Sequence, residues 1–220
     1  QGNEVNLLVD LPGDNDNLPP IVPELGTPTT RSKEDKLYTA DLLVMMRAFA
    51  REVRKYDGTR IVITGNAIQR PAARNLWKNQ SWTKDTRSQF IEMLGVQNPD
   101  PIDVLCTHVY PASAEEGYFS DASVGVEGLI RASMEAAGEL KKPLFLGEWG
   151  AQEAKYGTET REKFMELLEA IEDNEVPLSA MWVFDYPPHD TEEGINVSPD
   201  NGPREYMLQE IRKVNERMRK

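Results

Sequence analysis

From about residue 38 onward, the apolar and polar positions along the chain switch repeatedly between helical and strand spacing. Apolar residues at helical spacing run through 39–58, and Gly58 is the expected end of that helix. The short, β-branched run 60–66 then predicts a buried strand. The same patterns predict later strands at 102–111, 143–150 and 178–188, and later helices at 83–96, 123–140, 158–174 and 203–220. We expect Thr83 or Asp85 to cap the helix at 83–96.

These strand–helix units in series predict an α/β fold with parallel strands. The strands are apolar on both faces, as expected for parallel strands that are covered by helices. An open doubly wound sheet and a (β/α)8 TIM barrel both fit this order. No glycine-rich phosphate loop follows any of the strands, which weakens the doubly wound alternative. In a barrel, functional side chains lie at the carboxyl ends of the strands. The polar and aromatic residues at those ends are Asn66, His108, Tyr110, Glu148, Trp149, Trp182, Phe184 and Asp185.

The beginning of the sequence predicts only a fragment of one more unit. Residues 1–12 look like the end of a strand, and residues 10–37, rich in Pro, Gly, Asp and Asn, predict a long loop. Because four units make half of a barrel, we expect about three further units before residue 1, and we expect this chain alone not to close a barrel. The chain 1–220 is then the C-terminal part of a single barrel, a partial barrel from the end of the fourth strand through the eighth helix.

Composition and charge exclude several classes of partner. The chain has 220 residues and a net charge of −12, so nucleic acid and anionic membranes are poor partners, whereas a neutral substrate is not repelled. The two histidines exclude a multi-histidine metal site. The single cysteine, Cys106, stands in an apolar run and is expected to pack in the core. No apolar run approaches the roughly 20 residues that a membrane helix needs.

Short motifs stand at the strand ends in a fixed order. They are Asn3-Glu4, His108-x-Tyr110, Glu148 within the run LFLGEWG, and Trp182. A dipeptide such as Asn-Glu is common by chance, but an apolar strand that ends in Gly-Glu-Trp-Gly is more specific, and the whole ordered set is more specific still. In these motifs the chain resembles clan A of the glycoside hydrolases, and most of all glycoside hydrolase family 5, the cellulase and mannanase family. The resemblance covers the whole chain but only the second half of the family's barrel.

The resemblance implies retaining hydrolysis by two carboxyl groups. It gives Glu148, at the end of the seventh barrel strand, the role of nucleophile, and Glu4, at the end of the fourth, that of acid/base. Retaining hydrolysis uses two carboxyl groups about 5–5.5 Å apart. Glu148 has to stay ionised, and a hydroxyl group from Tyr110 is able to hydrogen-bond it in that state. Glu4 has to begin protonated, which we expect from its burial and from the nearby charge of Glu148.

The other implied roles concern substrate binding. Asn3 is expected to bind the sugar 2-hydroxyl, and Trp182, on the eighth strand, to offer a flat apolar face to a pyranose ring. His108 is expected to hydrogen-bond the substrate or to hold the Tyr110–Glu148 network. This chemistry requires neither a metal ion nor an organic cofactor. The expected partners are therefore a glycan substrate and the N-terminal half of the barrel.

Several other residues leave two interpretations open. Trp149 and Trp182 fit simple core packing as well as a place in the site, and Asp185, which follows the Trp182 strand end, is a candidate to line the cleft. Trp77 and Trp82 either extend the platform outward or pack their own loop. His189 has no counterpart in the family pattern and is expected in a loop.

Three interpretations of function follow. The first is a retaining glycoside hydrolase that cleaves β-1,4-linked polysaccharide or oligosaccharide, like a cellulase or mannanase, by double displacement. The second is a non-catalytic carbohydrate-binding barrel that kept the cleft. The third is a structural half-barrel that pairs with another chain. In the family, the early strands of the barrel supply an arginine near the nucleophile. Residues 1–220 do not include that part of the family pattern. Because polymeric glycans lie outside cells, the resemblance implies a secreted or periplasmic protein, without fixing which glycan it uses.

Overall fold

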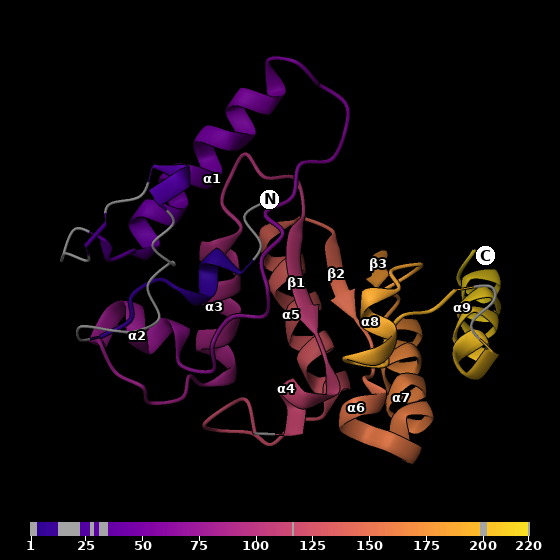
Figure 1. Ribbon diagram of the computed structural model, residues 1–220. Helices are drawn as coiled ribbons and strands as arrows, with labels where there is room; N and C mark the ends of the chain where they lie inside the picture. The colour runs from indigo at the N-terminus through magenta and orange to yellow at the C-terminus, as the bar shows by residue number, and fades with distance from the viewer. Residues whose placement is uncertain are drawn as a thin grey trace.

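The computed structural model describes residues 4–12, 23–26, 29–30, 35–115, 117–198 and 202–219. A sheet of parallel strands lies at its centre, in the order β1-β2-β3 (Figure 1). The strands are β1 (Leu105–Val109), β2 (Leu144–Trp149) and β3 (Leu178–Met181). They confirm the strands expected at 102–111, 143–150 and 178–188, and each is shorter than its pattern suggested. The fold is α/β, as the sequence predicted.

Long helices connect and cover the strands. They are α1 (Thr39–Arg54), α3 (Arg87–Gln97), α5 (Val126–Leu140), α7 (Thr160–Asp173) and α9 (Glu205–Met218). All of these helices were expected from the helical spacing of apolar residues. Neighbours along the chain also pack side by side, since α3 contacts α5, α5 contacts α7, and α7 contacts α9 (Figure 1).

Short helices that the sequence did not predict stand in the loops. Each strand is followed by one of them before the next long helix begins: α4 (Pro111–Glu115), α6 (Glu153–Tyr156) and α8 (Pro188–Thr191). Another helix, α2 (Ala73–Asn79), precedes α3, and 3-10 turns lie at Val5–Leu7, Pro23–Leu25, Gly157–Glu159 and Gly202–Arg204. The described parts of the loops at the carboxyl ends of the strands therefore contain short helices.

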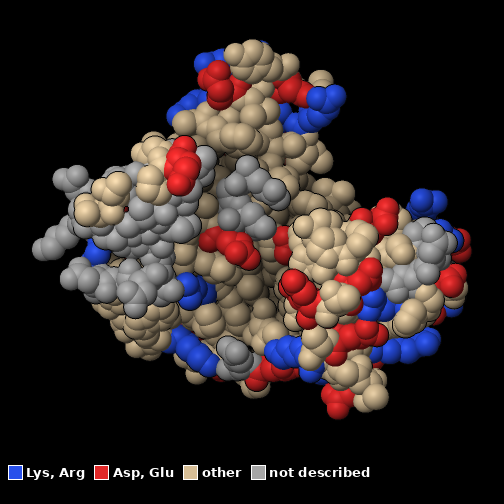
Figure 2. Space-filling model, viewed as in Figure 1, with Lys and Arg blue, Asp and Glu red and all other residues tan. Residues whose placement is uncertain are grey.

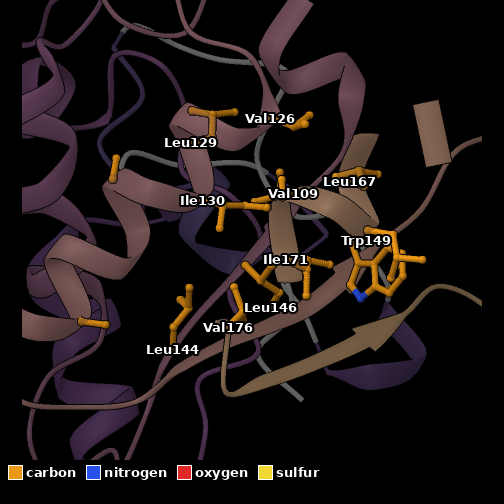
Figure 3. Packing of buried hydrophobic residues seen from close by; sticks show 14 of the residues in the cluster. Val109, Val126, Leu129, Ile130, Leu144, Leu146, Trp149, Leu167, Ile171 and Val176 are labelled. Carbon is orange, nitrogen blue, oxygen red and sulfur yellow. The ribbon is translucent and has the colours of Figure 1, made fainter. Parts of the chain in front are cut away.

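The main core lies between the sheet and the helices packed on it. Figure 3 shows the side chains that meet there, among them Val109, Leu144, Leu146 and Trp149 from the strands and Val126, Leu129, Ile130, Leu167 and Ile171 from α5 and α7. The indole ring of Trp149 is buried and stacks on Phe164 with 5.6 Å between the ring centroids. Of the two interpretations of Trp149, the structure supports core packing.

The strand expected at 60–66 does not form. Val62 makes a single backbone bond toward β1, accepting from Asp103 N at 3.0 Å, while its own N–H donates to the Asp103 carboxylate at 2.5 Å. Farther along, Thr64 donates to the side chain of Asn98 at 2.9 Å. The segment therefore runs beside β1, but side chains take the hydrogen bonds that a strand ladder would have made. This is a tertiary effect that residue propensity does not report.

The strand end expected within residues 1–12 is also absent from the part of that segment which the structure describes. Residues Val5–Leu7 form a 3-10 turn, in which Leu7 N donates to Glu4 O at 2.8 Å. The turn is held by Asn6, which is buried and donates to the backbone oxygen of Ala67 at 2.9 Å. Local turn bonds and contacts to the 60–70 segment hold the turn, and the β pairing that follows is a single isolated parallel bridge between Val9 and Leu37, where Asp10 N donates to Leu37 O at 2.9 Å.

Helix α3 begins at Arg87, later than the start near residue 83 or 85 that the sequence predicted. Its N-cap is Thr86, whose side chain accepts from Gln89 N, so Thr83 and Asp85 do not cap it. Asp85 caps α2 instead, because its carboxylate accepts from the backbone N–H groups of Arg74 at 2.7 Å and Asn75 at 2.9 Å. A carboxylate at a helix N-terminus satisfies donors that the helix leaves unpaired.

The described strands form an open sheet, so these residues do not close a barrel, as expected for this chain alone. β3 is an edge strand, and its residues Leu178–Ala180 are exposed. A hollow of about 800 Å³ lies beside this edge, lined by Leu178, Ile211, Val214 and other residues of α7 and α9. An unpaired strand edge beside apolar side chains is a surface that a further strand is able to cover.

Candidate active site

One extra residue in β2 sets the geometry of the site. Thr107 of β1 is paired with Leu146, but the next residue, His108, is paired with Glu148, so Gly147 has no partner of its own. The pairing between β2 and β3 shifts at the same place. This is a β-bulge, a feature that redirects the side chains after it.

The bulge turns Glu148 away from the helix-covered core. Leu144 and Leu146 face that core, and regular alternation would send residue 148 to the same side. Because Gly147 adds a residue, Trp149 takes the core position and Glu148 points to the opposite face. A side chain would be crowded at this position, since a Cβ here would lie 3.1 Å from both Cys106 Sγ and His108 Nε2.

Two side chains from β1 and its end contact the Glu148 carboxylate. The Tyr110 hydroxyl donates a hydrogen bond of 3.0 Å to Oε2 of Glu148, and Nδ1 of His108 lies 3.2 Å from the same oxygen. The side chain of Glu148 is 15% exposed, and that of His108 is 6% exposed. The carboxylate is therefore oriented and largely shielded, but it keeps access to the surface. Of the two roles expected for His108, its position fits holding the Tyr110–Glu148 network.

The Tyr110 hydroxyl is held in its protonated form. Burial, followed by the charge of Glu148 and the hydrogen bond to it, raises the pKa of Tyr110 well above its ordinary value. The charges of Glu193 and Glu4 act on the Tyr110 pKa in the same direction. Since the phenol keeps its proton, it remains a donor to Glu148 over the whole ordinary pH range.

Glu4 stands at the edge of the described residues, and Asn3 lies outside them. Glu4 precedes the 3-10 turn in a left-handed conformation, with φ of 65°, and its side chain is exposed. The burial that we expected for Glu4 is therefore not found, because a turn rather than a strand end positions it. Its charge nevertheless acts on Tyr110, the residue that binds Glu148. The contact to the Tyr110 hydroxyl is thus made by Glu148, whereas Glu4 acts on that hydroxyl through its charge.

Trp182 follows β3 directly and is half-buried. Its backbone N–H donates to Trp149 O at 2.9 Å, so it lies beside the residue that follows Glu148. Gly150 makes this approach possible, because a Cβ there would come within 2.7 Å of the Trp182 backbone oxygen. The end of β3 is therefore fixed next to the end of β2 by a contact that only glycine permits.

Three residues near the site were not predicted as part of it. Gln152, just beyond β2, donates to Oε2 of Glu193 at 2.9 Å. His189 lies in α8 rather than in the expected loop, and its ring meets Trp182 edge to face, with 5.8 Å between the ring centroids. The only sequence signal was the aromatic run around Trp182, which gave no reason to link it to Glu193.

A comparison with known protein families decides the family. The model of the cellulase family, described as glycosyl hydrolase family 5, matches residues 23–186. The chain belongs to glycoside hydrolase family 5. The match confirms the resemblance on which the sequence analysis relied. No match was found among curated protein sequences.

Solved structures with the same fold include two enzymes whose names state a mannanase activity. An endo-β-1,4-mannanase from Thermotoga petrophila has a TM-score of 0.55 and 15% identity, over 80% of this chain and 40% of that one. An endo-1,4-β-mannanase from Rhizomucor miehei has a TM-score of 0.55 and 16% identity, over 84% of this chain and 49% of that one. At these identities the likeness concerns the fold. The family 5 chain described here spans less than half of the length of either structure.

The remaining residues singled out in this family 5 chain lie at different places. Asp185 is exposed, with φ of 52°. Trp77 belongs to α2, where Lys78 Nζ lies 3.2 Å from its ring centre, and Trp82 is 52% exposed. Cys106 is fully buried, and burial raises the pKa of its thiol to about 11, which confirms the core position that we expected.

The chain carries a net charge of −12, and Figure 2 shows one face of the molecule, hollowed near its middle, with both acidic and basic side chains around the hollow. Within the described ranges, His, Cys, Asp and Glu side chains form no group of three or more that is able to hold a metal ion. In the same ranges, no helix has the length and apolar content needed to cross a membrane.

Proposed function

We propose that this family 5 chain carries the nucleophile of a retaining glycoside hydrolase that cleaves β-1,4-linked mannan or glucan. The observation that supports this most is the placement of Glu148 by the bulge at Gly147, with Tyr110 donating to its carboxylate at 3.0 Å. A carboxylate that is oriented, shielded and still reachable suits attack on a sugar carbon.

In the first step, an oxygen of Glu148 attacks the anomeric carbon while the bond to the leaving sugar oxygen breaks. The leaving oxygen takes a proton from Glu4, and a glycosyl ester forms on Glu148. In the second step, a water molecule gives a proton to Glu4 and attacks the same carbon, which releases Glu148 as a carboxylate. Two inversions at that carbon retain the β configuration.

Tyr110 contributes by keeping Glu148 ionised and correctly turned before attack. A hydrogen bond to a charged acceptor is stronger than one between neutral groups, so the protonated phenol favours the carboxylate form. As negative charge leaves Glu148 during ester formation, that bond weakens. The same loss of charge makes it easier for Glu4 to give up its proton and then to act as base.

Substrate binding is assigned to the residues that the family pattern indicated. Trp182 offers its ring face to a pyranose, and Asn3 binds the sugar 2-hydroxyl. The names of the two mannanases of the same fold favour β-1,4-linked mannan as the first substrate to test, with glucan as the second. We place the enzyme outside the cytoplasm, where such polymers occur.

We propose further that the intact enzyme contains an N-terminal half-barrel which covers two open surfaces of this chain. One is the edge of β3 with its hollow of about 800 Å³. The other is the exposed apolar side of α1, where Met45 is 40% and Phe49 50% exposed, beside Ile63. Apolar surface at both ends of an open sheet is what a barrel cut in half presents.

The test is the stereochemistry and Glu148 dependence of hydrolysis by the intact protein. Proton NMR of the first products from manno- and gluco-oligosaccharides is expected to show the β anomer, and Glu148→Gln is expected to abolish turnover without a change in folding. Products of inverted configuration would exclude the retaining mechanism. Binding of sugar without any product, unchanged in Glu148→Gln, would indicate a carbohydrate-binding protein instead.

A further inference from the structure

A chain of contacts links the end of β2 to the ring of Trp182. Gln152 donates to Oε2 of Glu193 at 2.9 Å, and the same oxygen lies 3.4 Å from Nδ1 of His189. The imidazole of His189 in turn meets Trp182 edge to face, with 5.8 Å between ring centroids and 84° between ring planes. On another side, the ring of Tyr186 lies 5.0 Å from that of His189.

The loop that carries these residues is anchored to the element after β2. Glu153 N donates to Gly194 O at 3.2 Å, and Ala154 N donates to Glu193 O at 3.1 Å. Gly194 has φ of 60°, and a Cβ there would lie 2.7 Å from Cβ of Glu153, so the close approach requires glycine. The backbone of Glu193 is therefore fixed relative to β2, and a fixed backbone allows its carboxylate to fix other groups.

A buried arginine, Arg204, also binds this loop. Arg204 is 6% exposed, and its Nε donates to Asn196 O at 2.6 Å. Its Nη2 donates to Asp190 at 2.6 Å, and its Nη1 bonds to Glu153. Three bonds from one buried guanidinium to two segments hold α8 and the following loop against α6. His189, next to Asp190, is therefore carried on a rigid support.

We propose that His189 and Glu193 are positioning residues that orient the indole ring of Trp182 for substrate. Nδ1 of His189 is buried and makes no hydrogen bond, and Oε2 of Glu193 lies 3.4 Å from it. The Glu193 carboxylate lies beside the imidazole, and the imidazole and indole rings meet edge to face. Edge-to-face contact of this kind restricts the tilt of an aromatic ring.

His189 and Glu193 contact the sugar platform and its support: His189 meets the ring of Trp182, and Glu193 binds Gln152. The charge of Glu193 also acts on Tyr110, where it helps to raise the pKa of the phenol. A residue that orients the sugar platform is expected to change substrate affinity more than the chemical step. The consequence for sugar depends on the proposed function, whereas the orientation of Trp182 does not.

The direct test follows the Trp182 ring itself in the intact protein. Labelling with fluorotryptophan gives each tryptophan its own fluorine NMR resonance, and the Trp182 resonance is the one lost in Trp182→Phe. His189→Ala and Glu193→Ala are expected to move the Trp182 resonance and to leave that of Trp149 in place. His189→Phe keeps an aromatic edge and is expected to move it less. The matched control is Glu192→Ala, which removes the neighbouring, exposed carboxylate.

The second readout is sugar affinity. In a Glu148→Gln background, His189→Ala is expected to weaken binding of a β-1,4-linked oligosaccharide about fivefold, and in the active enzyme to raise KM with little change in kcat. An unmoved Trp182 resonance in both alanine variants would overturn the positioning role. If the resonance moves but the wild-type protein neither binds nor cleaves glycans, the positioning role stands and the proposed function fails.

Discussion

The hydroxyl group of Tyr110 donates a 3.0 Å hydrogen bond to Oε2 of Glu148, across the pair of strands β1 and β2. The two residues are 38 positions apart in sequence, and both lie at the carboxyl ends of parallel strands. The contact exists because the bulge at Gly147 turns Glu148 toward Tyr110 and away from the core. Strand geometry, rather than local sequence, thus creates the central interaction of the site.

Removing that hydroxyl is expected to lower kcat. Tyr110→Phe removes the donor that orients the Glu148 carboxylate before attack, and a misplaced nucleophile is expected to lower kcat roughly 10- to 100-fold. Steady-state kinetics on the best oligosaccharide measure the loss. Tyr56→Phe, at a residue that is 85% exposed, is the control and is expected to change nothing. Wild-type kcat in Tyr110→Phe would remove Tyr110 from the mechanism.

Gly150 is expected to tolerate no side chain. A Cβ in Gly150→Ala would meet the Trp182 backbone oxygen at 2.7 Å, so the end of β3 must move, at a cost of about 1–3 kcal/mol in the free energy of unfolding. Denaturant unfolding measures the loss, and sugar binding is expected to weaken with it. Gly138→Ala is the control: it lies in α5 with no atom within 4 Å of the added Cβ, and is expected to stabilise by about 0.5–1 kcal/mol. Equal stability of the two variants would contradict the steric argument.

Stability in alkali is expected to depend on Cys106. Burial raises the pKa of its thiol from 9.0 to about 11, so the folded protein keeps this proton after the unfolded chain has lost it. Unfolding then releases a proton, and stability falls as pH rises from 9 toward 11, by an amount on the order of 3 kcal/mol.

The matched variant for that effect is Cys106→Ser, which has no group that titrates in this range. Backbone N–H groups of Gly65, Asn66 and Gly147 face the sulfur, and they are able to donate to a serine oxygen as well. Urea unfolding at several pH values between 8 and 11 compares the two proteins. Tyrosines such as Tyr110 and Tyr156, whose pKa values are also raised, affect both proteins alike. The same pH slope in both proteins would show that Cys106 is not the cause.

The long helices and the central strands were predicted well from the sequence. Each long helix repeats apolar residues at helical spacing, and each central strand is a short apolar run. The helices α5 and α7 and the strands β1 and β2 are examples, and all of them bury an apolar face in one core. The prediction of a strand at 60–66 was wrong, although the β-branched residues of this segment are typical of a strand. Its hydrogen bonds go to the side chains of Asp103 and Asn98, which no pattern within the segment reveals.

Of the expected geometry of the candidate site, the contact between Tyr110 and Glu148 is present, and the burial of Glu4 is not. Glu148 and Tyr110 were named as partners from the order of the motifs, and the structure places them in contact. Taken alone, Glu4 fits a solvated charge near a chain end, and the resemblance implied burial instead; the structure shows it exposed, because burial there depends on segments distant in sequence. His189 and Glu193 were missed for the same reason, since their link to Trp182 exists only after α8 and its loop fold against α6.

The most direct test of the central claim is covalent trapping of the nucleophile. The intact protein is incubated with an activated 2-deoxy-2-fluoro-β-mannoside or glucoside, digested, and analysed by mass spectrometry. The fluorine slows hydrolysis of the glycosyl ester, so the account predicts a fluorosugar attached to Glu148 and no label in Glu148→Gln. A fluorosugar on another carboxylate, or a Glu148→Gln variant that keeps half of the wild-type turnover, would contradict it.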